Sequence, residues 1–427
     1  MLVKNIINRF AESKLLTDAG TYAFFRAFDS LIPFLLLPII TRILSPEEFG
    51  VFVLFQAFLS ALLPLMTLSI DSSILLNFFK VKQEEFNSYF SSGYVLIIIS
   101  SLLFSLIILI FRIPLSAITK FPADWIIAVI FICFFQFHSN LALHLFQVKQ
   151  KPRQYGFYSI SLTAIKNTLM LFFVIIVGLK WKGMILGYLI TYAMFFLLSI
   201  YMFKGYNLFT KQIKKEFIID SVKIGYPLSL HQIGSWLSSF ATRIIVGGLL
   251  GTAAVGSFGV GATIGMIVGL IQDSFNKAFV PYLFNNLNNM SNTIEVKLIK
   301  LTYIYNITLL VFSACVGIFG YIFLDVIFGQ AYSQGKEVVL FISLAEAFSG
   351  MYKMHVNYIF YTKKTYLIFI ITMTTGILNI LLSYLFINKY GLVGGALSLC
   401  LINLIGYLMS WYIANRVFPM KWFKFAT

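Results

Sequence analysis

The chain has 427 residues, of which 59% are hydrophobic and only 11% are charged, so its charges are too few to cover a water-soluble protein of this length. Its formal net charge is +16. The basic residues are spread over the short segments between apolar runs, which is typical of a membrane protein and not of a nucleic-acid-binding protein.

Twelve apolar runs are long enough, at about 20 residues each, to cross a bilayer as helices. The expected spans are residues 22–44, 51–76, 90–111, 125–147, 157–179, 183–203, 226–250, 253–275, 303–324, 338–361, 366–387 and 392–415. They leave almost no chain for a soluble domain. The sequence therefore predicts an all-α polytopic membrane protein with twelve transmembrane helices.

The first residues form an amphipathic segment, which favours a short helix on the inner membrane surface. Its apolar face would comprise Leu2, Val3, Ile6, Ile7 and Phe10. The run that follows carries Arg26 and Asp29 and has no small-residue cleavage site, so we expect no cleavable signal peptide. With the N-terminus inside, the cytoplasmic segments hold about three times as many Lys and Arg as the outer loops. We therefore expect both termini in the cytoplasm.

The longest interruption near the middle of the chain, residues 204–227, carries five Lys and no apolar run long enough to span. It separates six expected helices from six. This predicts two six-helix bundles, residues 1–204, which include the amphipathic segment, and residues 205–427.

A short motif recurs at the same place in each half. "ILSPEEFGVF" (residues 43–52) and "LLGTAAVGSFGV" (residues 249–260) share three residues at an offset of 206. The matching pairs are Leu44 and Leu250, Gly50 and Gly256, and Phe52 and Phe258. Because each half has an even number of helices, the halves would be parallel repeats about an axis along the membrane normal, as in transporters that alternate between inward- and outward-facing states.

Two longer stretches carry a family resemblance. "LLLPIITRILSPEEFGVF" (residues 35–52) resembles the first-helix signature of the polysaccharide flippases, the Wzx type of the multidrug/oligosaccharidyl-lipid/polysaccharide (MOP) exporter superfamily, and "RIIVGGLLGTAAVGSFGV" (residues 243–260) is similar to the signature of its second half. The resemblance implies two bundles around a central cavity in the bacterial cytoplasmic (inner) membrane. It also implies transport of an undecaprenyl-pyrophosphate-linked repeat unit, of O-antigen or capsule, to the outer leaflet. The implied partners are this lipid-linked oligosaccharide, membrane lipid and the polysaccharide polymerase machinery.

Ionisable groups within the spans are expected to have a functional or structural role, because placing a charge in hydrocarbon is unfavourable. The candidates to bind a phosphate or an acidic sugar are Arg26, Lys166, His231, Arg243 and Lys353. Arg243 is favoured, because it ends a wide polar face. Arg26 and Asp29 lie three residues apart, so a structural ion pair is an equal alternative to a cavity-lining role.

Polar residues recur at helical spacing on several expected spans. Residues 226–250 carry His231, Ser235, Ser238 and Thr242, with Gln232, Ser239 and Arg243 beside them; residues 338–361 carry Glu346, Gly350, Lys353 and Asn357. Similar stripes are Thr67 and Asp71; Gln136, Asn140, His144 and Gln147; and Ser159, Thr163 and Lys166. Such faces cannot meet lipid. One shared polar cavity explains them more simply than separate packing contacts.

A row of glycines, Gly261, Gly265 and Gly269, lies within an expected span and is followed by Asp273. This spacing allows close packing of another helix. The row is interpreted as a packing surface and not as a phosphate loop, because no Lys-Ser/Thr pair follows it.

No pattern points to an enzyme. The sequence has no His-Glu-x-x-His motif and no nucleotide loop, and its three Cys have no metal or redox spacing, so we expect no cofactor and no metal. Without an ATP site, a gradient of H+ or Na+ is the expected energy source. Asp29, Asp71 and Glu346 are the candidate coupling groups. Ion pairing with Arg26 or Lys353 is the alternative role for such acids.

Two other functions compete with transport of a lipid-linked sugar. An ion-coupled multidrug/cation antiporter of the same superfamily would carry a more acidic cavity than these balanced charges indicate. A polymerase or ligase would need a large outer loop, and the outer loops here are short. The flippase for peptidoglycan precursors has two further helices, which this sequence lacks.

Overall fold

The computed structural model describes residues 14–422. The expected amphipathic segment, residues 2–10, lies outside this range. The side chains of residues 14–20, 22–24, 26–28, 30, 83 and 84 are likewise outside the description. The described chain is 89% helical and contains no strand.

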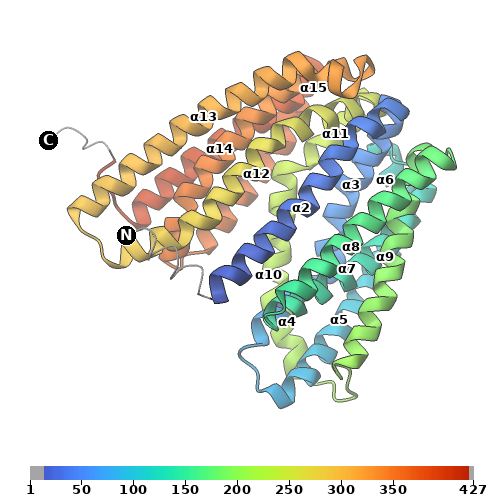
Figure 1. Ribbon diagram of the computed structural model, residues 1–427, viewed down its shortest axis with the longest axis vertical. Coiled ribbons are helices and arrows are strands. Elements are labelled where there is room, and N and C mark those ends of the chain that lie inside the picture. Colours follow the sequence, from blue (N-terminus) through green and yellow to red (C-terminus); the bar gives the residue numbers. More distant parts are fainter. Residues whose placement is uncertain (1–13, 423–427) are drawn as a thin grey trace. The chain divides into compact units, whose positions relative to one another are not determined.

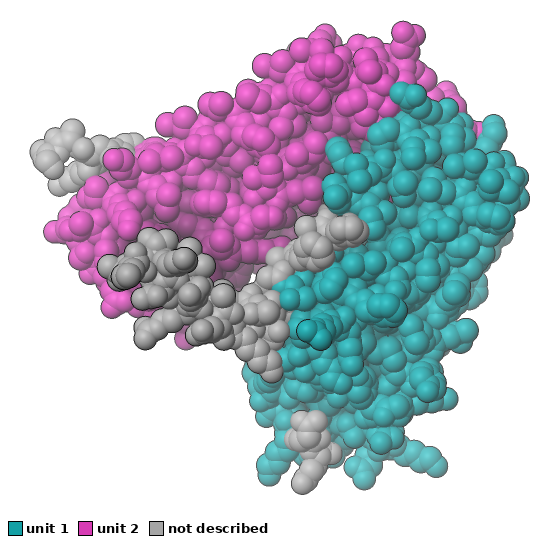
Figure 2. All heavy atoms as spheres, viewed as in Figure 1, with its two compact units in different colours: residues 1–44, 58–117, 121–230 teal, residues 45–57, 118–120, 231–427 magenta. Residues whose placement is uncertain are grey.

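The chain forms two compact units (Figure 2). Unit 1 comprises residues 1–44, 58–117 and 121–230, and unit 2 comprises residues 45–57, 118–120 and 231–427. The helices labelled in Figure 1 from the first half are α2 (Lys14–Ile43), α3 (Pro46–Thr67), α4 (Ile70–Asn77), α5 (Gln83–Ile110), α6 (Arg112–Thr119), α7 (Ile126–Val148), α8 (Pro152–Leu171) and α9 (Lys180–Gly205). Those from the second half are α10 (Lys215–Ser239), α11 (Ala241–Leu250), α12 (Thr252–Asn288), α13 (Asn292–Phe328), α14 (Lys336–Tyr361) and α15 (Tyr366–Val417).

Eight helices of the described chain are long and apolar enough to cross a membrane, or nine if the bent pair of α10 and α11 counts as one span. The predicted total of twelve is therefore not reached by this criterion and stays a prediction. Two of the expected spans, residues 366–387 and 392–415, lie within the 52-residue α15. Gly391 interrupts that helix with φ 61°, a left-handed conformation that glycine adopts without a steric penalty.

The expectation of one continuous helix over residues 51–76 is wrong. α3 ends at Thr67, and Leu68 and Ser69 take left-handed φ values of 49° and 50° before α4 begins. Thr67 Oγ1 donates to the Leu63 carbonyl oxygen (3.0 Å) and accepts from the Ser69 N–H (3.3 Å). The expected span includes the short polar stretch at the break, Ser69 to Ser73 with Ile70 within it, because apolar residues lie on both sides of it. The expected span 226–250 is also bent, by 45°, between α10 and α11.

The recurring motif begins a helix in both halves. In the first copy Ser45 and Glu48 form a capping box: the Ser45 N–H donates to Glu48 Oε2 (3.1 Å) and the Glu48 N–H donates to Ser45 Oγ (3.3 Å). Pro46 is the first helical residue, where its missing N–H costs nothing. In the second copy Gly251, at φ 87°, precedes α12 at the position equivalent to Ser45.

The two copies pack against each other within unit 2. A Cβ on Gly50 would collide with the carbonyl oxygen of Thr252, and a Cβ on Gly256 would collide with that of Pro46. Thr252 is the repeat equivalent of Pro46, so the contact is reciprocal. The two glycines therefore recur because each copy of the turn is the surface on which the other copy packs.

The glycine row of α12 is a packing surface, as predicted. Added Cβ atoms on Gly261, Gly265 and Gly269 would meet Val338, Ile342 and Glu346, respectively. All three of these contacts come from one face of α14. The absence of side chains at these three positions thus lets α14 lie against α12.

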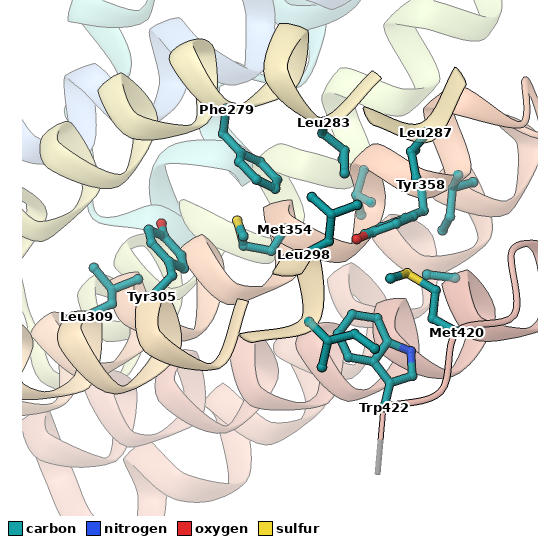
Figure 3. Packing of buried hydrophobic residues seen from close by; sticks show 14 of the residues in the cluster. Phe279, Leu283, Leu287, Leu298, Tyr305, Leu309, Met354, Tyr358, Met420 and Trp422 are labelled. Carbon is teal, nitrogen blue, oxygen red and sulfur yellow. The ribbon is translucent and has the colours of Figure 1, made fainter. Parts of the chain in front are cut away.

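The core of unit 2 is a cluster of buried apolar residues from α12, α13, α14, α15 and the segment after α15 (Figure 3). Phe279, Leu298, Met354 and Trp422 belong to it and are each at most 4% exposed. The segment after α15 therefore covers part of this core.

Residues 205–230 pack in unit 1. Ser88 and Ser91 donate to the carbonyl oxygens of Gln212 (2.6 Å) and Leu208 (3.0 Å). Lys214 pairs with Glu85 at 2.7 Å, and this hydrogen bond raises the pKa of Lys214 above its ordinary value. The basic central segment is thus a structured connection that is fastened to the start of α5.

Candidate functional site

Unit 2 contains a polar pocket of about 370 Å³ formed by α10, α12, α14 and α15. Its polar lining residues are His231, Ser235, Ser238, Ser239, Asn276, Ser349, Tyr352, Lys353, Asn357, Thr372, Thr375 and Asn403. The pocket joins the predicted stripe of residues 226–250 to the predicted stripe of residues 338–361. His231 and Lys353, two of the predicted ligands, therefore lie in one site.

Hydrogen bonds between helices hold the pocket walls. Thr372 Oγ1 lies 3.3 Å from His231 Nδ1, and Ser238 Oγ lies 3.1 Å from Thr375 Oγ1, so α10 is tied to α15. Asn357 Nδ2 donates to Asn276 Oδ1 (2.8 Å), which ties α14 to α12. The polar groups are therefore preorganised before any ligand arrives.

The charge of the pocket comes from Lys353. Its Nζ donates to Asp273 Oδ1 on α12, and not to Glu346 on its own helix. Among the described residues that line the pocket there is one lysine and no carboxylate. An anionic ligand would therefore compete with Asp273 for Lys353.

Arg243, the favoured cation, lies outside this pocket. It is 6% exposed in the bend between α10 and α11, where it donates to the Ser239 carbonyl oxygen (2.9 Å) and stacks on Phe240 (4.6 Å to the ring centroid). Glu346 packs over Gly269 and interacts electrostatically with Arg243. The stripe on α14 is thus divided: Lys353 and Asn357 line the pocket, whereas Glu346 lies against α12.

The remaining candidates lie in unit 1, in two clusters. In the first, Ser159 Oγ donates to Asp29 Oδ2, and Lys166 lies over the Tyr188 ring at 4.9 Å. In the second, Asp71 Oδ2 lies 3.4 Å from His144 Nδ1, which joins α4 to α7. Arg26 lies on α2, but its side chain is outside the described residues, so the predicted Arg26–Asp29 pair stays a prediction.

Sequence reasoning missed the contribution of α15. Thr372, Thr375, Asn379 and Ser383 follow one another at helical spacing, which is the same signal that identified the other stripes. Thr372 and Thr375 line the pocket. Asn379 is fully buried and bonds to Leu237 and Thr242 at the bend between α10 and α11.

The chemistry of the pocket suits a sugar. Hydroxyl and amide groups can donate and accept hydrogen bonds, and the rings of Tyr352 and Phe360 supply flat apolar faces. A single lysine adds attraction for a phosphate or an acidic group. The described chain has no cluster of ligands that could hold a metal ion.

Comparisons with known proteins agree with a pocket that suits a sugar. Residues 15–287, more than half of the chain, match the family model described as polysaccharide biosynthesis protein. The capsular polysaccharide biosynthesis protein CapF of Staphylococcus aureus is 23% identical over 411 residues, which cover 91% of this chain and 96% of CapF. Protein 1 of the Lsg locus of Haemophilus influenzae is 24% identical, over 83% of this chain and 87% of its own length.

Solved structures show the fold. The lipid II flippase MurJ, in an inward closed conformation, matches with a TM-score of 0.71 at 14% identity, over 92% of this chain and 87% of that one. An inward-facing multidrug resistance MATE family transporter of the MOP superfamily matches with a TM-score of 0.64 at 14% identity, over 92% and 98%. The chain is therefore a multi-pass membrane protein with the fold of the MOP transporters, as its sequence motifs indicated, and it belongs to the polysaccharide biosynthesis protein family.

Proposed function

We propose that the chain is a flippase that carries an undecaprenyl-pyrophosphate-linked oligosaccharide, an O-antigen or capsule repeat unit, from the cytoplasmic to the outer leaflet by alternating access. The family match supports the pathway, and the fold supports transport over enzymatic chemistry. In this proposal the protein lies in the bacterial inner membrane with both termini in the cytoplasm, and two repeats of six helices surround the translocation cavity.

The pocket in unit 2 is the observation that carries the proposal. A site for cationic drugs would be expected to present carboxylates, because an unpaired cation in a low-dielectric site needs a negative partner. The described lining instead offers polar hydrogen-bonding groups and one lysine, whose carboxylate partner Asp273 is not among the lining residues. That set matches an oligosaccharide with an anionic end.

If transport is coupled to an ion gradient, the coupling groups would be carboxylates that lie close to other titratable groups. Asp71 lies 3.4 Å from His144, and this carboxylate–imidazole pair is the candidate for a proton site. Asp29 and Glu346 remain candidates of the same kind.

The test is a strain that lacks this gene, with the wild-type gene restored as control. Surface polysaccharide and susceptibility to cationic drugs are measured side by side. We expect lost polysaccharide, with lipid-linked repeat units trapped on the cytoplasmic side, and unchanged drug susceptibility.

Normal polysaccharide together with heightened sensitivity to cationic drugs would refute the flippase. It would support the multidrug/cation antiporter, in which the partly buried acids Asp29, Asp71 and Glu346 are the binding groups.

A further inference from the structure

Unit 1 has an apolar groove of about 660 Å³ between α8 and α9, on a different face of α8 from the stripe of Ser159, Thr163 and Lys166. The buried side chains of Phe146, Tyr158 and Phe195 form its floor. Its sides are lined by Ile165, Met194 and Leu198. Both helices are long and apolar enough to cross a membrane. The groove therefore runs along a membrane-spanning part of the protein.

The floor of the groove is rigid. The Tyr158 ring packs edge-on against Phe195 (4.9 Å between centroids) and against Phe146 (5.9 Å). Tyr158 Oη lies 2.8 Å from Ser199 Oγ, so its one polar atom is already hydrogen-bonded inside the protein. The surface that the groove presents is thus preformed and apolar.

The sides of the groove are open. Met194 is 49% exposed and Leu198 is 43% exposed. In a helix that crosses a bilayer, such exposed apolar side chains meet hydrocarbon chains and not water. The groove is therefore accessible to a lipid chain from the membrane.

One end of the groove is cationic. Arg153, at the start of α8, lines it and makes no hydrogen bond or ion pair with any described residue. Lys149 and Lys151 precede it, and both lie over the Tyr206 ring, at 4.1 and 5.2 Å from its centroid. A ligand that complements the whole site has an anionic end and a hydrocarbon chain.

We propose that this groove binds the polyprenyl chain of the lipid carrier, with the carrier phosphate at Arg153. The inference rests on the proposed function and assigns a site to the tail of the cargo. A single groove takes a single hydrocarbon chain, and the carrier has only one. The methyl-branched, unsaturated chain is wider and more polarisable than an acyl chain, and a methionine-lined wall over an aromatic floor adapts to such a shape.

The test measures binding of polyprenyl phosphate to the purified full-length protein by native mass spectrometry. Leu198→Trp and Met194→Trp fill the groove, and Arg153→Ala removes the cation. Each should weaken binding by about tenfold or more, because the two Trp side chains exclude the lipid chain from the apolar surface of the groove and Arg153→Ala removes a charge-assisted hydrogen bond.

Matched controls lie next to the site. Leu197→Trp adds the same ring to the neighbouring residue of α9, which is 66% exposed and does not line the groove, and Lys204→Ala removes an exposed cation elsewhere on α9. Both should leave affinity within about twofold of wild type, because isolated surface substitutions change free energies little. A thermal melt of each variant separates lost binding from lost folding.

Two further ligands identify which part of the lipid is bound. Polyprenol, which lacks the phosphate, should be sensitive to Leu198→Trp and insensitive to Arg153→Ala. Phosphatidylglycerol should not displace polyprenyl phosphate at equal concentration; displacement would make the groove a general anionic-lipid site and would overturn the proposal.

Unchanged affinity in the groove variants, or no binding of polyprenyl phosphate to the wild-type protein, would also overturn it. Neither result bears on the proposed flippase function, which the deletion strain tests separately through trapped repeat units.

Discussion

At the scale of single residues, the interaction between Lys353 and Asp273 controls the charge of the polar pocket. Lys353 lines the pocket, and its ammonium group is already held by a carboxylate from α12. The pair joins two helices, so it can stabilise their packing. Alternatively, Asp273 can hold the Lys353 ammonium group in position to bind an anionic ligand. The two roles make opposite predictions for the two partners.

Removing each partner in turn distinguishes the roles. Lys353→Ala should lower surface polysaccharide by about tenfold or more at equal protein level, the factor expected for a lost charge-assisted hydrogen bond. Asp273→Asn should leave it unchanged or raise it, because Lys353 is then free for the ligand. Lys364→Ala, in the exposed turn after α14, is the control. Equal losses in the Lys353 and Asp273 variants would show that the pair is only structural.

A second residue-scale feature is the hydrogen-bonded network at Asn379. Asn379 Nδ2 donates to the Leu237 carbonyl oxygen (2.8 Å) and to Thr242 Oγ1 (3.1 Å), and Ser383 Oγ donates to Asn379 Oδ1 (3.1 Å). Leu237 lies near the end of α10, where the bend at Phe240 leaves carbonyl groups without a helical partner. The amide therefore supplies the hydrogen bond that the bent helix lacks.

Asn379→Leu should lower the free energy of unfolding by about 1–2 kcal/mol, because it leaves a buried carbonyl and a hydroxyl short of a donor. Thermal unfolding in detergent measures this change. Asn388→Leu is the matched control, since Asn388 is exposed on the same helix and bonds only to Tyr384 four residues earlier. An Asn379 variant as stable as the control would show that water or Ser383 replaces the amide.

At the scale of elements, the recurring motif both begins a helix and forms a close packing contact. Its first residues start a helix, through the Ser45–Glu48 capping box in one copy and Gly251 in the other. Its glycine then allows the backbones of the two copies to approach each other. Gly50 and Gly256 each leave room for a carbonyl group of the opposite copy. The amide nitrogen of Gly256 lies 3.0 Å from the position that a Cβ on Gly50 would take. A side chain at either position would separate α3 from α12.

Gly50→Ala and Gly256→Ala should each destabilise the protein by about 1–3 kcal/mol, the usual cost of overpacking. The double variant should cost less than the sum, because both methyl groups force apart the same contact. Gly205→Ala, at the end of α9, is the control, since nothing lies within 4 Å of its added Cβ. Additive losses in the thermal melt would show that the two glycines do not share one contact.

At the scale of the whole molecule, the compact units do not follow the order of the chain. Residues 45–57 and 118–120 from the first half belong to unit 2, and residues 205–230 belong to unit 1. Asp220 of α10, for example, accepts hydrogen bonds from Asn77 Nδ2 (3.1 Å) and Tyr89 Oη (2.8 Å). Each half of the sequence therefore supplies part of the unit built by the other half.

We accordingly expect that the predicted half, residues 1–204, is not stable when it is expressed alone. It lacks the partner of Asn77 and Tyr89, and its residues 45–57 lack the α12 surface on which they pack. Co-expression with residues 205–427 should restore both fragments to the membrane. Protease resistance and steady-state level of each fragment measure this. A fragment 1–204 that resists protease without its partner would identify it as an autonomous bundle.

The class of protein, the helical periodicity and much of the polar pocket follow directly from the order of the amino acids. Spans, stripes and the glycine row depend on composition and on a repeat of 3.6 residues, which a sequence displays without any knowledge of distant contacts. The spacing of His231, Ser238, Lys353 and Asn357 alone assigned them to polar helix faces. Packing of the helices brings these four residues into one pocket.

The partner that each polar group takes is a property of the folded chain. Helical spacing places Glu346 and Lys353 on one face, but packing of α12 against α14 brings Asp273 to Lys353 and Gly269 to Glu346. Distant segments also contact the break after Thr67, where Ser100 Oγ donates to the Met66 carbonyl oxygen, and the bend at Phe240, where Asn379 donates to the Leu237 carbonyl oxygen. The contact of Gly50 with the second repeat is likewise between distant segments. Within a membrane the hydrophobic effect does not drive helices together, because lipid is as apolar as their side chains. Close packing and hydrogen bonds between helices therefore determine which helices associate. Neither can be deduced from the spacing of residues along one helix.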